Sequence, residues 1–262
     1  MIINIVGGRG KMGQVHAPIF KRAGHKVIIS GRETIPSLEE ATKQADITIF
    51  SVPISALEDN LKNFGKYCKA LMDFSSVKTL PIEWMLKYTS KDCEVAGLHP
   101  EYGSIPSIKN RSIIYCKTER TGEKCEEIVR CLQNEGAKIR TMTPKYHDLL
   151  ATRNQLARLA LMKTLGVYLA ETIDVEDIYE SSPPPTKIII DLLARQVAPE
   201  NDEMYDAMEK YNPFWQSEKQ QLLKCMQRVL EGKENPDKIR KFFGKELEPA
   251  QKRAAEFIKQ VK

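Results

Sequence analysis

Long apolar runs are missing from this sequence of 262 residues. No stretch reaches the ~18 consecutive apolar residues that a membrane-spanning helix requires, so no association with a membrane is expected. The opening segment MIINIVGGRG also lacks the basic start and the unbroken apolar core of a secretory signal peptide. The expected location of the chain is therefore the cytoplasm.

Patterns for binding metal ions and nucleic acids are missing as well. The six cysteines, at positions 68, 93, 116, 125, 131 and 225, form no Cys-x-x-Cys pair and no zinc-finger spacing with a histidine. This predicts reduced thiols and no metal site. The net charge is only +5, without a dense run of lysine and arginine, so nucleic acid is not an expected partner. A mild positive excess suits an anionic small molecule.

A glycine-rich segment follows the first apolar run. IINIV predicts a strand, GGRGKMG a turn, QVHAPIFKRAG a helix and HKVIIS a second strand. In this context Gly8-x-Gly10-x-x-Gly13 predicts a dinucleotide site. Gly8 permits the tight turn, Gly10 lets the backbone approach a pyrophosphate, and Gly13 lets the helix pack against the sheet. The predicted cofactor site also includes the loop residues Arg9, Lys11 and Met12.

The end of the second strand bears on which dinucleotide is bound. A NAD site usually offers Asp or Glu there to the ribose 2′-hydroxyl, whereas this chain continues with Ser30, Gly31 and Arg32. A guanidinium binds a 2′-phosphate through paired hydrogen bonds, and Ser30 offers a hydroxyl. This predicts NADP in preference to NAD. Glu33 is the residue that would serve a NAD site instead.

Alternating strand and helix patterns continue to about residue 143, after which only helical spacing is found. We therefore expect a Rossmann-type, doubly wound parallel α/β sheet over residues 1–146, followed by an all-helical domain for substrate binding and dimerisation over 147–262. Ligands of such sheets bind at the carboxyl ends of the strands. The strand tips SVPI (with Val52 and Pro53, assigned to the cofactor), DFSSVK and LHPEYG should therefore face one cleft.

The helical half has its own internal signals. Apolar residues between 145 and 172 recur at helical spacing and predict a long, largely buried helix. The proline-rich segment 181–187 and the prolines at 199, 213 and 236 are expected to separate the later helices. This half uses up the remaining length, so no appended regulatory domain is expected.

Six segments, in order over most of the chain, resemble the prephenate/arogenate dehydrogenase family. They are IVGGRGKMG, DITIFSVPI, DFSSVK, LHPEYGSIPSIKN, TPKYHD and SSPPPTKIIIDLLARQVAPENDEMYDAM. The resemblance implies NAD(P)-dependent oxidation of a cyclohexadienyl carboxylate, with loss of carbon dioxide, to an aromatic product in tyrosine biosynthesis. It also implies a homodimer formed through the helical domain. An alternative is a β-hydroxyacid-type or deazaflavin-linked NADP reductase, which shares the GG-x-G and SGR patterns. Such a reductase has no reason to carry SSVK and LHP together.

The resemblance assigns roles to individual residues. His99 corresponds to the catalytic histidine, Ser76 to a serine near that histidine and the nicotinamide, and Arg195 to an arginine that holds a substrate carboxylate. The chemistry is consistent, since a histidine can accept the hydroxyl proton as hydride leaves and an arginine pairs with a carboxylate. His147 and Asp148 also fit the family pattern, and the expected role there is a cap at a helix start.

Two departures from the family pattern concern the substrate. Glu101 follows the LHP motif where the family usually has an apolar residue, and the family's second histidine is replaced by Leu159, beside Arg158. Glu101 and Arg158 are therefore candidate substrate-binding residues. A carboxylate near the base suits a cationic substrate group, which suggests arogenate or 4-amino-4-deoxyprephenate. The alternatives are that Glu101 points to solvent, or that the chain is an NADP-binding homologue with reduced catalysis.

Overall fold

The computed structural model describes residues 1–198 and 202–259. The chain divides into two compact units, of which the first is Met1–Ala151 with Asp206–Pro213 and the second is Thr152–Tyr205 with Phe214–Lys262. The predicted boundary between residues 146 and 147 falls inside helix α6 (Pro144–Ala151). The predicted break at Pro199 lies outside the described residues.

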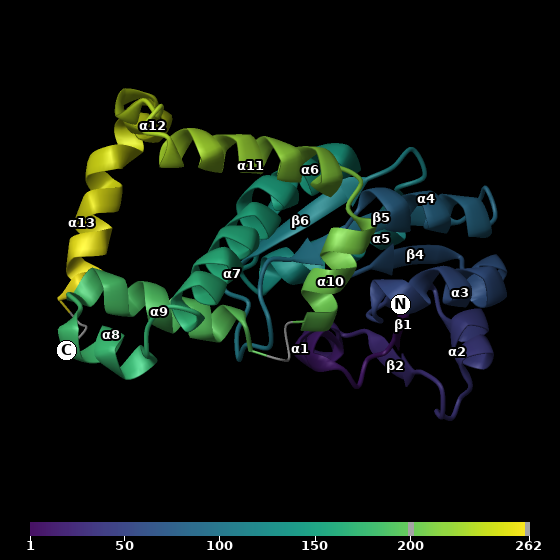
Figure 1. The fold of residues 1–262 in the computed structure, drawn as a ribbon. Coiled ribbons are helices and arrows are strands. Elements are labelled where there is room, and N and C mark those ends of the chain that lie inside the picture. The colour runs from purple at the N-terminus through teal and green to yellow at the C-terminus, as the bar shows by residue number, and fades with distance from the viewer. Residues whose placement is uncertain (199–201, 260–262) are drawn as a thin grey trace. The chain divides into compact units, whose positions relative to one another are not determined.

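The first unit is built on a seven-stranded sheet in the order β2-β1-β3-β4-β5-β6-β7 (Figure 1). The strands are β1 (Ile2–Val6), β2 (Lys26–Ser30), β3 (Ile47–Phe50), β4 (Ala70–Asp73), β5 (Glu94–Pro100), β6 (Ser112–Lys117) and β7 (Lys138–Thr141). Neighbouring strands are parallel except β5 and β6, which are antiparallel. The predicted Rossmann-type, mostly parallel sheet is confirmed.

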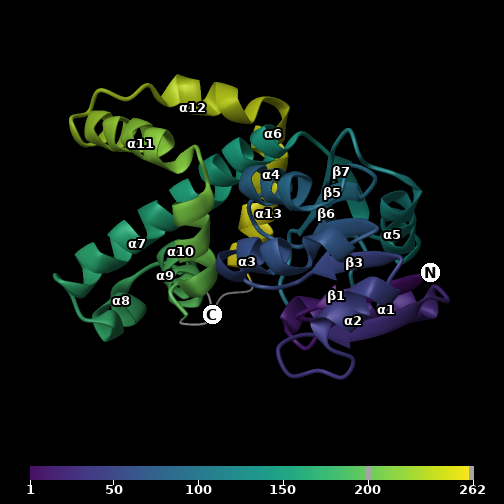
Figure 2. The same cartoon turned by 90° about the vertical axis from the view of Figure 1, so that its right-hand side faces the viewer.

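Helices cover both faces of this sheet, as two views show (Figures 1 and 2). Helices α1 (Lys11–Arg22) and α5 (Glu123–Asn134) contribute to one apolar core with β1, β3, β4 and β5. Helices α3 (Ile54–Phe64) and α4 (Thr79–Tyr88) form a second core on the other face. Strands buried on both faces explain the near-continuous apolar runs in the sequence.

Helix α2 (Leu38–Gln44) begins with a capping box. The Ser37 hydroxyl accepts a hydrogen bond from the backbone N–H of Glu40, and the Glu40 carboxylate accepts one from the backbone N–H of Ser37 at 2.9 Å. This reciprocal pair satisfies two donors that the helix start leaves unpaired. Ser37 therefore caps α2.

The second unit is helical throughout its described residues. A π-helical turn over Thr152–Leu156 leads into α7 (Ala157–Ala170), and the remaining helices are α8 (Val175–Ser181), α9 (Pro184–Gln196), α11 (Trp215–Leu230), α12 (Pro236–Phe243) and α13 (Leu247–Ile258). Helix α10 (Asp202–Tyr211) begins in this unit and ends in the first. Together with the sheet, this confirms an α/β fold followed by a helical region.

The expectation that residues 145–172 form a largely buried helix is only half right. The segment is helical, but Leu159 is the buried residue of α7, whereas Leu161, Val167 and Tyr168 are 43%, 59% and 62% exposed. Apolar residues surround α7 on more sides than its neighbouring helices cover. Among the described residues, no helix is both long and apolar enough to span a membrane.

Candidate active site

The carboxyl ends of the parallel strands meet at one edge of the sheet. Gly7 follows β1 and donates a backbone hydrogen bond to the Ser30 carbonyl at 2.8 Å, so the tips of β1 and β2 are joined there. In the β4–β5 register, Asp73 pairs with Gly97, which places His99 just beyond the tip of β4. Strand β2 lies on one side of β1 and strand β3 on the other, so the strand order reverses between β1 and β3. Ligands of such sheets bind at this switch point.

The glycine-rich turn has the shape of a phosphate cradle. The left-handed backbone lies at Gly7, with a φ of +76°, and a Cβ at Gly8 would lie 2.5 Å from Cδ1 of Ile29. A Cβ at Gly13 would lie 2.3 Å from the Gly8 Cα, so only glycine lets α1 approach the turn this closely. The first turn of α1 contains no acidic residue. Its free N–H groups and partial positive charge therefore suit a pyrophosphate.

Other residues predicted to bind the cofactor surround this turn. Arg9 and Lys11 are exposed and Met12 is partly buried. Val52 lies beside the turn, with its Cγ1 atom 3.0 Å from the position that a Cβ at Gly7 would take. Pro53 is the residue before the first turn of α3. These side chains and the helix start together fit a dinucleotide.

The two residues assigned to the 2′-phosphate have different surroundings. The Ser30 side chain is buried and its hydroxyl donates to Asn4 Oδ1 at 2.7 Å. Arg32 and Glu33 are both exposed. The Ser30 hydroxyl is therefore used inside the fold, and Arg32 is the exposed member of this pair.

His99 lies near the end of β5 and is 6% exposed. Its Nδ1 atom is 2.8 Å from Nε2 of His147, and the rings cross at 77°. Nδ1 of His147 in turn is 2.8 Å from Oδ1 of Asp148. Residues 48 positions apart in sequence thus form one buried chain of hydrogen bonds.

Asp148 acts as a helix cap, as expected, although it caps the start of α4 and not that of its own helix. It lies inside α6, and its carboxylate accepts from the backbone N–H groups of Lys78 at 2.7 Å and Thr79 at 2.8 Å, at the start of α4. The reason is that the end of α6 runs beside this start, so the side chain reaches unpaired donors of α4 rather than those of its own helix. His147 contacts His99 and does not cap a helix.

A buried ion pair lies beneath His99. The Lys78 side chain is fully buried, and its Nζ donates to Asp73 Oδ2 at 2.6 Å and to the Leu98 carbonyl at 2.8 Å. A Cβ at Gly97 would lie 3.0 Å from the Lys78 side chain and 3.3 Å from Asp73 Oδ1. The glycine in AGLHP therefore makes room for this pair. Sequence reasoning did not assign Lys78 or Asp73, although both stand in the DFSSVK segment.

These surroundings keep the His99 imidazole neutral. Burial is the main cause that holds the pKa of His99 well below its ordinary value, and the nearby His147 and the Lys78 ammonium act in the same direction. A neutral imidazole has one nitrogen with a free electron pair, which is the form that a general base requires.

Ser76 and Glu101 are two other predicted site residues, and they follow β4 and β5. Ser76 is partly buried on the loop between β4 and α4, and no hydrogen bond joins it to His99 among the described residues. Oε1 of Glu101 is 3.5 Å from Nδ1 of His99, and its side chain is 31% exposed. A carboxylate therefore lies at the rim of the buried histidine pair.

The two predicted substrate-binding arginines belong to the second unit. Arg158, on α7, donates to the Gln196 side chain, and Gln196 in turn donates to the Tyr205 hydroxyl. Arg195 is the exposed neighbour of Gln196 on α9. Leu159, at the place of the family's second histidine, is buried. Within this unit, Arg158 is thus held against the helix that carries Arg195.

Two groups of side chains could in principle hold a metal ion: His99 with Glu101 and His147, and His25 with Glu127 and Cys131. In the first, the two imidazoles already contact each other at 2.8 Å. In the second, Nε2 of His25 lies 3.3 Å from both the Cys131 sulfur and the Glu127 carboxylate. Hydrogen bonds satisfy both groups, so neither is proposed as a metal site.

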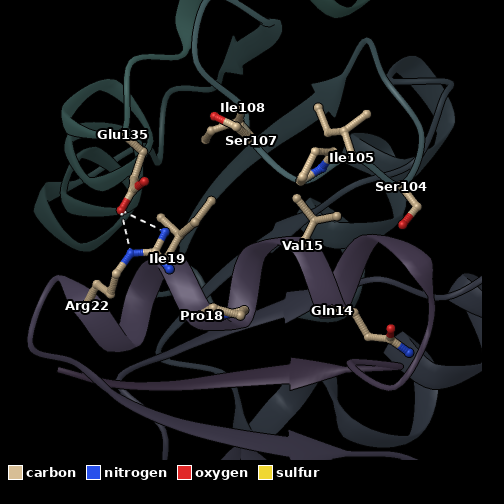
Figure 3. Close-up of a pocket in the computed structure, with 11 residues that line it drawn as sticks. Gln14, Val15, Pro18, Ile19, Arg22, Ser104, Ile105, Ser107, Ile108 and Glu135 are labelled. Carbon is tan, nitrogen blue, oxygen red and sulfur yellow. Dashed lines mark hydrogen bonds and ion pairs between the residues drawn. The ribbon is translucent and has the colours of Figure 1, made fainter.

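A separate pocket of about 330 Å³ runs along α1. Figure 3 shows Val15 and Ile19 of α1 on one side, Ile105 and Ile108 on the other, and the ion pair between Arg22 and Glu135 at one end. Its lining contains neither His99 nor the glycine-rich turn. It is therefore distinct from the candidate active site.

Several of the known proteins that this chain resembles are prephenate or arogenate dehydrogenases. A family profile described as "Prephenate dehydrogenase, nucleotide-binding domain" matches residues 19–141. The probable arogenate/prephenate dehydrogenase of Methanocaldococcus jannaschii is 27% identical over 235 residues, which cover 81% of this chain. The chain spans 52% of the length of that relative.

Two further comparisons cover more of both chains. The 4-amino-4-deoxyprephenate dehydrogenase of Streptomyces pristinaespiralis is 24% identical over 254 residues, covering 89% of this chain and 85% of that protein. The crystal structure of the Aquifex aeolicus prephenate dehydrogenase, in complex with hydroxyphenyl propionate and NAD+, superimposes with a TM-score of 0.66 at 19% identity, over 99% of this chain and 95% of that one. The second likeness concerns the fold alone.

Proposed function

Because its sequence is similar to prephenate and arogenate dehydrogenases, we propose that this chain is a member of that family and catalyses the NAD(P)-dependent oxidative decarboxylation of a cyclohexadienyl carboxylate of the prephenate type. The observation that carries this proposal is the buried, neutral His99 at the sheet edge that also holds the glycine-rich turn. The product would be an aromatic compound on the route to tyrosine.

The proposed mechanism divides the work among a few residues. His99 accepts the proton of the ring hydroxyl as the ring carbon that bears it becomes electron-poor. A bound nicotinamide would supply the acceptor for the hydride. Arg195 pairs with a substrate carboxylate and so orients the ring, and Ser76 offers a hydroxyl to the substrate oxygen or the imidazole. Loss of carbon dioxide then leaves an aromatic ring.

The experiment that tests this function is a steady-state assay of nicotinamide reduction and carbon dioxide release, with prephenate and arogenate as substrates. We expect turnover of at least one of them and a fall of about 10²–10⁴-fold in kcat for His99→Ala, the range typical of a general base. Equal, low rates for the wild type and His99→Ala would instead favour an NADP-binding homologue with reduced catalysis.

A second candidate substrate is 4-amino-4-deoxyprephenate. It is favoured by Glu101, whose carboxylate lies 3.5 Å from His99 and could face the ammonium group that replaces the ring hydroxyl. The similarity to a 4-amino-4-deoxyprephenate dehydrogenase also supports it. The two candidates are separated by comparing kcat/KM for prephenate, arogenate and the amino compound. Equal or faster turnover of prephenate would reject the amino-substituted substrates.

We also propose NADP as the preferred dinucleotide and a homodimer as the assembly. Arg32 is exposed at the end of β2, where a 2′-phosphate would lie. Leu230 and Phe242 of the helical unit are 84% and 82% exposed in the single chain, and exposed apolar surface of this kind suits a subunit interface. Sedimentation velocity would test the assembly, and a monomer at micromolar concentration would contradict it.

A further inference from the structure

We propose that His147 and Asp148 are positioning residues that hold His99 in one tautomer, with its proton on Nδ1 and its electron pair on Nε2. The same three residues then share the proton that His99 takes from the substrate. This inference rests on the proposed function, in which His99 is the base. It goes beyond that function because it assigns a role to the two residues that the sequence suggested only as a helix cap.

The tautomer follows from Asp148 upward. The backbone N–H groups of Lys78 and Thr79 donate to its oxygens Oδ1 and Oδ2, and Nδ1 of His147 also lies 2.8 Å from Oδ1. An oxygen of a carboxylate is an acceptor. Nδ1 of His147 must therefore carry hydrogen. In a neutral imidazole, Nε2 is then an acceptor, so the 2.8 Å contact requires that Nδ1 of His99 be the donor. The electron pair of His99 is left on Nε2.

The position of Asp148 is itself fixed from several sides. Its carboxylate caps the start of α4, and its backbone carbonyl accepts from the Asn212 side chain at 2.9 Å. Both rings of the histidine pair are buried. A base whose orientation is fixed before substrate binds loses little free energy to reorganisation during the reaction.

The local charges balance when the proton arrives. The buried Lys78 ammonium is paired with the Asp73 carboxylate, which leaves the Asp148 carboxylate to offset the positive charge that forms on the histidine pair. Glu101, at the end of β5, is the other carboxylate that faces His99. The proton taken up at Nε2 of His99 is matched by movement of the Nδ1 proton toward Nε2 of His147.

Asp148→Asn is the sharpest test because it changes the tautomer with little change in shape. Oδ1 of Asp148 accepts from the Lys78 N–H and contacts Nδ1 of His147, whereas Oδ2 accepts from the Thr79 N–H. With the amide oxygen in place of Oδ2, the NH2 group takes the place of Oδ1, donates to Nδ1 of His147 and gives up only the hydrogen bond from Lys78. His147 then donates from Nε2 to His99, and the proton of His99 moves to Nε2, which abolishes the base. We expect kcat to fall by about 10²–10⁴-fold and KM to change by less than about threefold. A loss in kcat with little change in KM indicates an interaction that is made only in the transition state.

His147 offers a conservative rescue. In His147→Gln the amide oxygen can accept from Nδ1 of His99, whereas the leucine of His147→Leu cannot. We expect kcat of the glutamine variant to exceed that of the leucine variant by about tenfold or more. Ser37→Ala is the matched control for a lost helix cap elsewhere, since Ser37 caps α2, and it should lower stability without changing kcat.

The ring tautomer can also be read without turnover. ¹⁵N chemical shifts of the labelled wild-type protein should show hydrogen on Nδ1 of His99, and those of Asp148→Asn should show it on Nε2. Hydrogen on Nε2 in the wild type, or equal kcat values for His147→Gln and His147→Leu, would overturn the proposal. If no substrate is turned over but the ring shifts are as expected, the proposed function fails and the hydrogen-bond assignment stands.

Discussion

The Tyr102 hydroxyl donates a hydrogen bond to Nε2 of His16 at 3.0 Å. His16 lies on α1, directly after the glycine-rich turn, and its Nδ1 donates to the Met12 carbonyl at 2.8 Å. Tyr102 lies three residues after His99. The loop that follows the proposed base is thus attached to the helix that would hold the dinucleotide, although the two are 86 residues apart in sequence.

Removal of that hydroxyl should weaken the fold. In Tyr102→Phe the buried Nε2 of His16 loses its partner, and an unsatisfied buried polar group costs about 1–3 kcal/mol. We expect the free energy of unfolding in urea to fall by that amount. The matched control is Tyr168→Phe, because Tyr168 is 62% exposed. Equal stability of the Tyr102 variant and the wild type would contradict the contact.

Stability should also depend on pH through His16. Burial lowers the pKa of His16 from 6.5 to about 4, so between these values the unfolded chain binds a proton that the folded chain does not. The free energy of unfolding should therefore be highest above pH 6.5 and fall by up to about 3 kcal/mol as the pH drops toward 4. His99, whose pKa is also lowered, adds to the same slope. Urea titrations across this window, with His16→Gln for comparison, measure the share of His16.

The buried pair of Lys78 and Asp73 gives a third prediction. Lys78→Met leaves the Asp73 carboxylate buried without its cation, which typically costs about 3–5 kcal/mol. The double variant Lys78→Met, Asp73→Asn removes the charge as well and should recover part of that loss. Thermal and urea unfolding of the single and double variants measure the coupling. A stability loss in the double variant that equals or exceeds the sum of the losses in Lys78→Met and Asp73→Asn would contradict a stabilising coupling between the two residues.

Gly13 gives a fourth, steric prediction. In Gly13→Ala the new Cβ would lie 2.3 Å from the Gly8 Cα, so α1 and the turn must move apart. We expect dinucleotide binding to weaken by at least tenfold, about 1.4 kcal/mol, as measured by fluorescence titration. Gly103→Ala is the control, since a Cβ at Gly103 would meet no atom within 4 Å. Unchanged affinity in Gly13→Ala would argue against a phosphate cradle at this turn.

The fifth prediction concerns the choice of dinucleotide. Arg32→Ala should weaken NADP binding by about 10–100-fold, since a hydrogen bond to a charged group contributes about 1.5–3 kcal/mol, and should leave NAD binding nearly unchanged. Lys91→Ala removes an exposed positive charge elsewhere and serves as the control. Tighter binding of NAD than NADP by the wild type would refute the preference and point to Glu33.

Most of the sheet could be predicted from local sequence because its signals are local. Apolar runs of four to seven residues, separated by helical spacing and by turns, predict where each strand and helix of the first unit lies. The same holds for the serine cap of α2 and for the glycine-rich turn between β1 and α1. Each of these features depends on residues that are close in sequence, so a pattern of a few residues is enough to predict them.

Tertiary structure decided what lies next to what. The antiparallel placement of β6, the left-handed turn at Gly7 and the exposure of α7 all depend on the packing of distant elements. The sequence by itself marked His99 as the base and suggested a cap at Asp148. Only the fold brought Asp148 to the start of α4, 70 residues away, and His147 to His99, because hydrogen bonds form between groups that are close in space whatever their separation along the chain.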